Sequence, residues 1–307
     1  PQFLRPRNFD CDLALDGIRQ MLWGFFKKVV VADNCALFVN GVFENYQTLD
    51  GSTLFLGAFF FTIQIYGDFS GYSDIAIGCA RLFGIDLMQN FKYPYFSRDI
   101  AEFWRRWHIS LTTWFRDYIY IPLGGSRAGK WKSFRNTLVI FLVSGFWHGA
   151  NWTFVAWGAY HALLFLPLLL LGQNRRYRDS VAENSFFPSV KELTQMGVTF
   201  LLVLLGWILF RSEDISQAAV YLERMFNASL FSAPQLVGLG FGQLLLKKCF
   251  FFTALMFVVE WIGRKQAHGL MIEDLSLPVR YVIYTVLLII IYGFDASNPQ
   301  GFIYFQF

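Results

Sequence analysis

Long apolar blocks without charge dominate this chain and leave it little polar surface with which to face water. In the clearest block, from Tyr281 to Gly293, no charged side chain occurs between Arg280 and Asp295. Only 16% of all residues are charged, whereas about a quarter are charged in an ordinary soluble domain. The composition therefore excludes a disordered chain, a coiled coil and a soluble enzyme of ordinary composition.

A helix that crosses a membrane needs about 20 mostly apolar residues. We therefore predict an all-α, polytopic membrane protein with six to eight buried or spanning helices. The clearest candidate segments are residues 136–170, 194–211, 249–263 and 279–294. The first of these is too long for one crossing, and its glycines and Pro167 favour two elements that meet near Gly149.

Charge, cysteines and chain ends narrow the remaining possibilities. The net charge of +4 is small and scattered, which argues against a nucleic-acid partner and is typical of Lys and Arg at membrane boundaries. The four cysteines are far apart, without a Cys-x-x-Cys pair, so we predict no metal site. The sequence starts without Met. We expect a fragment that lacks N-terminal helices, with residues 1–307 forming a single transmembrane domain.

Ionisable groups at membrane depth are costly and usually functional, and three segments place such groups among apolar residues. The first is predicted to be one amphipathic helix over residues 97–118, with Ser97 as its N-cap. At 100° per residue its apolar stripe includes His108. Two roles stay open for His108: a core histidine bonded to a neighbouring carbonyl, or a general base in a dry site.

The second segment is Ser144-Gly-Phe-Trp-His-Gly-Ala-Asn-Trp152, in which His148 separates two apolar runs. The small residues that follow His148 leave room for a ligand or for a close helix. A histidine at this depth is expensive unless it is functional or hydrogen-bonded. Of the other histidines, we predict a structural role for His161 and solvent exposure for His268, which lies in a polar connector.

The third segment is Tyr66-Gly-Asp-Phe-Ser-Gly-Tyr-Ser-Asp74, which holds two carboxylates, two serines and two glycines. This pattern predicts a broken helix that lines a cavity, because irregular backbone at depth must be satisfied by protein or water. The alternative is a structural kink capped by polar residues. Candidate residues for contact with substrate or for lining a tunnel are Asp68, Ser70, Tyr72, Asp74, Trp107, Trp147 and Asn151.

Several motifs together resemble the membrane-bound O-acyltransferase family. The similarity is greatest to its branch that acetylates alginate and related bacterial exopolysaccharides, and the matches follow the expected order along nearly the whole chain. The motifs are Phe103-Trp-Arg-Arg-Trp-His-Ile-Ser-Leu, Trp114-Phe-Arg-Asp-Tyr-Ile-Tyr-Ile-Pro-Leu-Gly-Gly125, Phe146-Trp-His-Gly-Ala150, the segment from Gly67 to Asp74, and Phe302-Ile-Tyr-Phe-Gln-Phe307.

The resemblance implies a polytopic bundle, with amphipathic and re-entrant helices around a central funnel or tunnel, in the bacterial inner membrane. It implies that His148 and His108 are the two working histidines. It also implies that acetyl-CoA, used as a substrate and not held as a permanent cofactor, donates an acetyl group from the cytoplasm. Periplasmic acetyltransferase partners and the polysaccharide synthesis complex would then complete O-acetylation outside.

The chemistry of the two histidines suits such a transfer. An alcohol attacks a thioester poorly unless a base takes its proton, and a positioned histidine is typically worth about 10²–10⁴ in rate. We hypothesise that His148 is this base and that His108 orients it or assists proton transfer. Basic residues that would hold the phosphates of CoA, or else anchor the protein at the membrane boundary, are Arg105, Arg106, Arg127 and Lys130.

Two other functions remain open at this point. A transporter of an acyl carrier or of a glycan would also have polar breaks in its helices, without doing chemistry. A D-alanyl transferase acting on teichoic acid would carry the same histidines. Transfer of a labelled acetyl group by purified protein distinguishes these alternatives.

Overall fold

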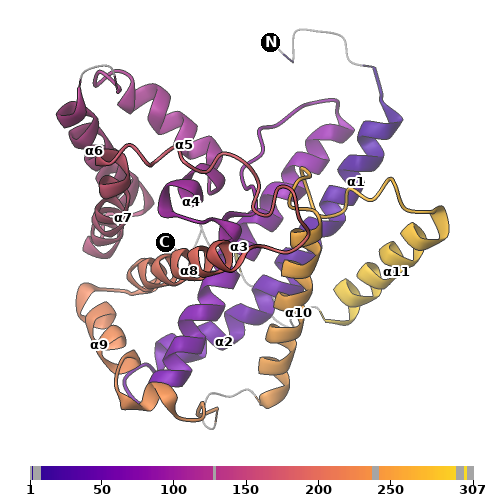
Figure 1. Ribbon diagram of the computed structural model, residues 1–307. Helices are drawn as coiled ribbons and strands as arrows, with labels where there is room; N and C mark the ends of the chain where they lie inside the picture. The colour runs from indigo at the N-terminus through magenta and orange to yellow at the C-terminus, as the bar shows by residue number, and fades with distance from the viewer. Residues whose placement is uncertain (1, 3–7, 127–128, 237–241, 295–300, 303–307) are drawn as a thin grey trace. The chain divides into compact units, whose positions relative to one another are not determined.

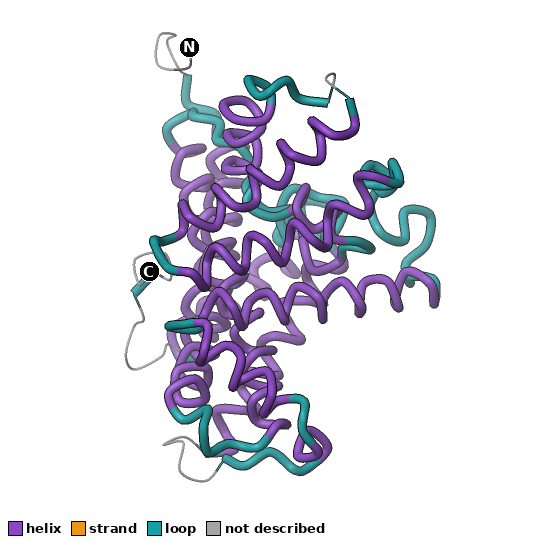
Figure 2. The backbone as a smooth tube through the Cα atoms, turned by 90° about the vertical axis from the view of Figure 1, so that its left-hand side faces the viewer, coloured by secondary structure: helices purple, strands orange, loops and turns teal. Residues whose placement is uncertain are grey.

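The computed structural model describes residues 2, 8–126, 129–236, 242–294 and 301–302. Throughout these ranges the chain forms helices and loops and no strand (Figures 1 and 2). The prediction of an all-helical fold is thereby confirmed for the described residues.

The chain divides into two compact units, which are described separately. The first unit comprises residues 1–41, 63–90 and 236–306, and the second comprises residues 42–62, 91–235 and 307. Helices α2 and α3 each contribute residues to both units. A single transmembrane domain over the whole chain remains a prediction.

The elements follow one another in a simple order (Figure 1). The N-terminal part consists of α1 (Cys11–Phe25), a π-helix η2 (Phe26–Ala32), α2 (Asp33–Glu44) and α3 (Gly51–Leu82). The middle part consists of η3 (Pro94–Phe96), α4 (Ile100–Arg106), α5 (Ile109–Phe115), η4 (Arg116–Tyr120), α6 (Lys130–His148) and α7 (Trp152–Leu170). The C-terminal part consists of α8 (Val190–Arg211), α9 (Ile215–Met225), η5 (Ala228–Phe231), α10 (Gln243–Ile262) and α11 (Leu277–Gly293).

Glycines bring α1 and α3 into backbone contact within the first unit. A Cβ atom placed on Gly24 would lie 2.6 Å from the carbonyl oxygen of Gly71, and one on Gly71 would lie 2.7 Å from that of Gly24. Gly17 and Gly78 face each other in the same way, about two helical turns away. Small residues are what allow helices to approach this closely.

Two adjacent lysines of η2 pair with the carboxylates of α3. Lys27 Nζ lies 2.6 Å from an oxygen of Asp74, and Lys28 Nζ lies 2.6 Å from Asp68 Oδ1. Lys28 also contacts Asp33 at 2.8 Å. The predicted helix break over residues 66–74 is therefore wrong: α3 is continuous, because its glycines serve helix packing and its carboxylates are paired with lysines.

The predicted division of residues 136–170 near Gly149 is confirmed. Helix α6 ends at His148 and α7 begins at Trp152, and the two form a hairpin (Figure 1). A Cβ atom on Gly145 would collide with the carbonyl oxygen of Phe154, and one on Gly158 would collide with that of Phe141. Of the small residues that follow His148, Gly149 lies against the ring of Phe154 in α7, which a Cβ atom there would approach to 2.5 Å.

Within the part of the chain that the structure describes, two helices are long and apolar enough to cross a membrane, judged by length and composition, namely α7 and α8. They correspond to the second half of the first predicted segment and to the second predicted segment. Helix α11 is apolar but shorter. The larger number of spanning helices expected from the sequence stays a prediction.

Replacing Gly71 by Ala should lower the stability of the first unit. The added methyl group would overlap the backbone of α1, and overpacking of this kind typically costs about 1–3 kcal/mol. The matched control is Gly197→Ala in α8, where nothing lies within 4 Å of the added Cβ. Thermal unfolding in detergent should show a lower midpoint for Gly71→Ala and an unchanged or higher one for Gly197→Ala.

Candidate active site

The segment predicted as one helix over residues 97–118 is broken at its centre, and that prediction is wrong. Helix α4 ends at Arg106, Trp107 is extended, and α5 begins at Ile109. Asp99, not Ser97, caps α4 by accepting a hydrogen bond from the backbone N–H of Glu102. The break leaves His108 between two short helices instead of in the middle of one.

His108 has a left-handed backbone conformation, with φ 45° and ψ 55°. Residues other than glycine seldom adopt positive φ, although histidine, asparagine and aspartate do so more often than most. Strained backbone of this kind tends to occur where it positions a functional side chain. The conformation sets the direction in which the His108 side chain leaves the chain.

His148 is the last residue of α6, and aromatic rings surround it. Its ring centroid lies 5.2 Å from that of Trp157 and 5.1 Å from that of Phe210, both at steep angles. The neighbouring Trp147 lies edge-on to His108, at 6.3 Å. The two imidazoles are close enough to interact electrostatically. The structure therefore brings together the two histidines that the sequence singled out.

Both candidate histidines are half-buried. Burial lowers the pKa of His108 from its usual 6.5 to about 4, because the apolar surroundings disfavour the charged ring. His108 is therefore neutral at pH 7, and one nitrogen of a neutral imidazole is an acceptor. The hydroxyl of Ser110 lies 3.4 Å from its Nδ1.

Other predicted residues near the histidines have structural contacts. Asn151 caps α7 by accepting a hydrogen bond from Thr153 N–H, and its amide donates to the carbonyl of Glu213 at 2.7 Å. Trp107 is only 2% exposed and packs on Trp207 at 5.0 Å. Trp147, by contrast, is 52% exposed. Of the three, Trp147 is the one that borders the histidines and also reaches the surface.

The basic residues predicted to hold phosphates differ in what they contact. Arg105 donates to the backbone carbonyls of Asn174 and Tyr177, and Arg106 is buried and paired with Glu102 at 2.6 Å. Lys130 is exposed at the start of α6. Arg127 lies outside the described residues. A role for these four residues in holding a donor remains a prediction.

The candidate substrate residues of the third segment all lie in the first unit, whereas the histidines lie in the second. Asp68 and Asp74 form the lysine pairs described above. Ser70 is buried, and Tyr72 is 51% exposed and stacks on Phe302 at 4.6 Å. Contact of these residues with substrate is likewise still a prediction.

The histidines outside this pair are both buried. His268 is 2% exposed, and its Nε2 lies 2.9 Å from Asp16, so the prediction of solvent exposure is wrong. The polar connector folds back on α1, where Asp16 offers the imidazole a partner. His161 is fully buried among aromatic rings of α4, α7 and α8.

A buried ion-pair network, not found from the sequence, supports this region. Glu102 is 1% exposed and accepts hydrogen bonds from both Arg98 and Arg106. Arg98 also bonds Asp179 in the loop after α7. The signal was available in the sequence as an Arg, Glu, Arg series spaced by four residues, the spacing at which charged side chains pair along a helix. In the structure Arg98 precedes α4, and Glu102 and Arg106 lie in it.

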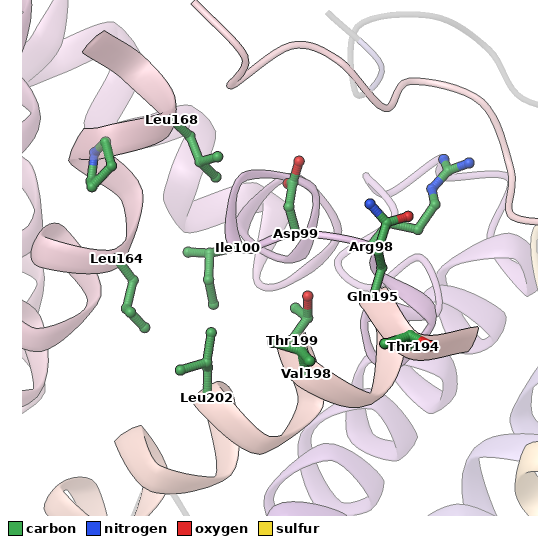
Figure 3. A pocket seen from close by; sticks show the side chains of 11 residues that line it. Arg98, Asp99, Ile100, Leu164, Leu168, Thr194, Gln195, Val198, Thr199 and Leu202 are labelled. Carbon is green, nitrogen blue, oxygen red and sulfur yellow. The ribbon is translucent and has the colours of Figure 1, made fainter. Parts of the chain in front are cut away.

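An apolar cavity of about 330 Å³ lies between α4, α7 and α8 (Figure 3). Neither His108 nor His148 lines it. Its walls are largely leucine, valine and isoleucine, with Arg98, Asp99, Thr194 and Gln195 on the polar side.

Comparison with known proteins now decides the family. The sequence model of the membrane-bound O-acyltransferase family matches residues 19–176, which include both histidines at the break and at the hairpin. The chain belongs to this family.

Individual relatives agree with this assignment. The chain is 40% identical over 245 residues to the probable alginate O-acetylase of Pseudomonas aeruginosa, covering 78% of this chain and 45% of that protein. It is 38% identical over 224 residues to a peptidoglycan O-acetyltransferase of Helicobacter pylori, covering 73% and 40%. It is 28% identical over 214 residues to a teichoic acid D-alanyltransferase of Bacillus subtilis, covering 66% and 52%. The chain thus spans about half the length of the curated relatives it matches.

Replacing His108 by Asn should keep the fold, because asparagine tolerates the left-handed conformation, whereas a β-branched residue such as Val should destabilise it.

The stability of the protein should also depend on pH through His108. The folded protein holds His108 neutral down to about pH 4, while the unfolded chain binds a proton near pH 6.5. Between those values the unfolded state binds more protons, so this residue's contribution to stability falls as the pH is lowered. Unfolding midpoints measured from pH 7 to pH 4 should fall less steeply for His108→Asn than for the parent.

Replacing Glu102 by Gln should strongly destabilise the second unit, because it removes the carboxylate paired with the buried guanidinium of Arg106 and one of the carboxylates paired with Arg98. Breaking a buried pair in this way typically costs about 3–5 kcal/mol. Asp117→Asn is the control, since the pair of Asp117 with Arg116 is exposed. A similar unfolding midpoint for both variants would contradict the structural role of Glu102.

Proposed function

We propose that this chain is the histidine-bearing part of a membrane-bound O-acyltransferase that transfers an acetyl group toward the hydroxyl groups of an exopolysaccharide such as alginate. The observation that carries the proposal is the pairing of His108 and His148, from two separate helix ends, in one aromatic environment. Family membership supplies the reaction class, and the names of the most similar relatives supply the acetyl group and the type of acceptor.

In this reaction His148 acts as the general base. The acceptor hydroxyl gives its proton to the imidazole as its oxygen attacks the thioester carbonyl. The new C–O bond forms, the C–S bond breaks, and the departing thiolate takes the proton back from the ring. A neutral ring is required at the start, and the apolar residues around both imidazoles favour that state.

His108 serves as the partner that orients His148 or relays its proton. Its left-handed backbone sets the direction of the ring. Trp147 contacts both imidazole rings, which ties the end of α6 to the α4–α5 break.

The donor in this proposal is acetyl-CoA, reached from the cytoplasm, and the setting is a multi-pass bundle around a tunnel in the bacterial inner membrane. Two apolar helices, α7 and α8, support membrane insertion by their length and composition. Lys130 and Arg105 are the basic residues with exposed surface on which the phosphates of the donor would rest. Periplasmic acetyltransferases and the polysaccharide synthesis complex would act next.

Transfer of D-alanine to teichoic acid is the second candidate. The chain is 38% identical over 163 residues to a teichoic acid D-alanyltransferase of Streptococcus thermophilus. Supplying the purified whole protein with labelled acetyl and labelled D-alanyl donors separates the two functions. A protein that only transports a carrier or a glycan would transfer neither label.

Replacing His148 by Ala in the whole protein should reduce acetyl transfer by about 10²–10⁴, the usual contribution of a positioned general base. His268→Gln is the control, because it removes a buried histidine of the first unit that has an ion-pair role. Polymer acetylation in cells is the measurement, with membrane insertion checked by fractionation. Full acetylation by a well-inserted His148→Ala protein would refute the assignment.

A further inference from the structure

Four side chains in the second unit carry buried nitrogen atoms without hydrogen-bond partners among the described residues. Both ring nitrogens of His161 are in this state, and the side chain is 0% exposed. The indole Nε1 atoms of Trp104, Trp157 and Trp207 share it. More than nine-tenths of buried polar groups in proteins are paired, so a group of five unpaired nitrogens needs an explanation.

The four rings form one cluster around His161. The ring centroid of His161 lies 4.9 Å from that of Trp104, 5.2 Å from that of Trp157 and 6.4 Å from that of Trp207. Gly206 lets α8 approach the imidazole: a Cβ atom there would lie 2.6 Å from His161 Nε2. The rings that carry the unpaired nitrogens therefore form one cluster between α4, α7 and α8.

Contacts between rings cannot satisfy this cluster. The ring of Trp104 stands at 89° to that of His161, so a ring face is available to an N–H group. A neutral imidazole, however, has one donor and one acceptor nitrogen, and the indoles are donors only. The cluster thus has four N–H donors and one acceptor atom. Even when one indole donates to the lone pair of His161, three N–H groups are left with no acceptor atom among the rings. Water is both donor and acceptor, and a buried water typically makes about three such bonds.

The cavity described above lies between the same three helices, close to the cluster. Figure 3 shows the side chains of Ile100, Leu164 and Leu202 converging on the space between α4, α7 and α8. Each is three or four residues, and so about one helical turn, from a residue of its own helix that belongs to the cluster or packs against it. These residues are Trp104, His161 and Gly206, respectively.

The cluster also adjoins the proposed base. Trp157 contacts His161 on one side and lies at 90° to His148, 5.2 Å away, on the other. We propose that the His161 cluster is an internal site for an ordered water molecule, and that His161 is a positioning residue that holds Trp157, and through it His148, in place for acyl transfer. The positioning role rests on the proposed function, whereas the water site does not.

A structure of the whole protein at a resolution that shows ordered water tests the site directly. The expected result is a water molecule within hydrogen-bond distance of a His161 ring nitrogen and of at least one indole Nε1. A dry cluster would overturn the proposal. This measurement does not depend on acetyl transfer, so it stays informative if the proposed function fails.

Two substitutions test the positioning role. His161→Leu has a similar volume but no polar atom, and His161→Gln keeps a donor and an acceptor. Provided that the parent protein is active, kcat should fall at least about tenfold in His161→Leu, with little change in KM. This loss is smaller than the loss expected on removing a general base itself. His161→Gln should recover much of that loss. The control is Leu166→Ala, also buried in α7, which should lower the unfolding temperature and leave kcat near that of the parent.

The unfolding temperature distinguishes a purely structural histidine. If no water is bound, His161→Leu removes two unsatisfied nitrogens and should raise the unfolding temperature, with kcat unchanged. That result would overturn the proposal, as would equal loss of kcat in the Leu and Gln variants. A loss of kcat in His161→Leu without a rise in unfolding temperature, and recovery in His161→Gln, would support it.

Discussion

The need to pair buried charges shapes this structure, because the chain has few charged residues and much apolar surface. Lys27 and Lys28 are tolerated inside the first unit because Asp74 and Asp68 face them. In the second unit, Arg98 and Arg106 are tolerated because Glu102 pairs with both of them. Breaking such a pair costs far more than forming it gains, so these charges fix which helix faces meet.

This requirement gives the candidate site its character. The charged groups around α4 are occupied with one another, whereas His108 and His148 lie at helix ends among aromatic rings. Such surroundings keep an imidazole neutral, as the pKa of His108 near 4 indicates. The two candidate reactive histidines and the ion-paired structural charges around α4 are thus separate sets of residues.

Much of this was predictable from local sequence, and the failures have a common cause. The hairpin break after His148 follows from glycines in an apolar block that is too long for one helix, and the two histidines follow from their cost at depth. The break at His108 was missed because the helical stripe is regular there and nothing local marks the positive φ. The continuity of α3 was missed because the partners of Asp68 and Asp74 lie about 40 residues earlier in the chain. The prediction that His268 is exposed failed for the same reason, because its partner Asp16 is distant in sequence.

The glycine contacts of the α6–α7 hairpin have a mechanical consequence. Gly145 and Gly158 each seat a backbone carbonyl of the opposite helix, so the two helices interlock at two points and resist sliding along each other. His148 and Trp157 therefore move together, as parts of one rigid hairpin. Any change in the position of His148 relative to His108 must then come from elements outside the hairpin, such as the short segment around the left-handed His108.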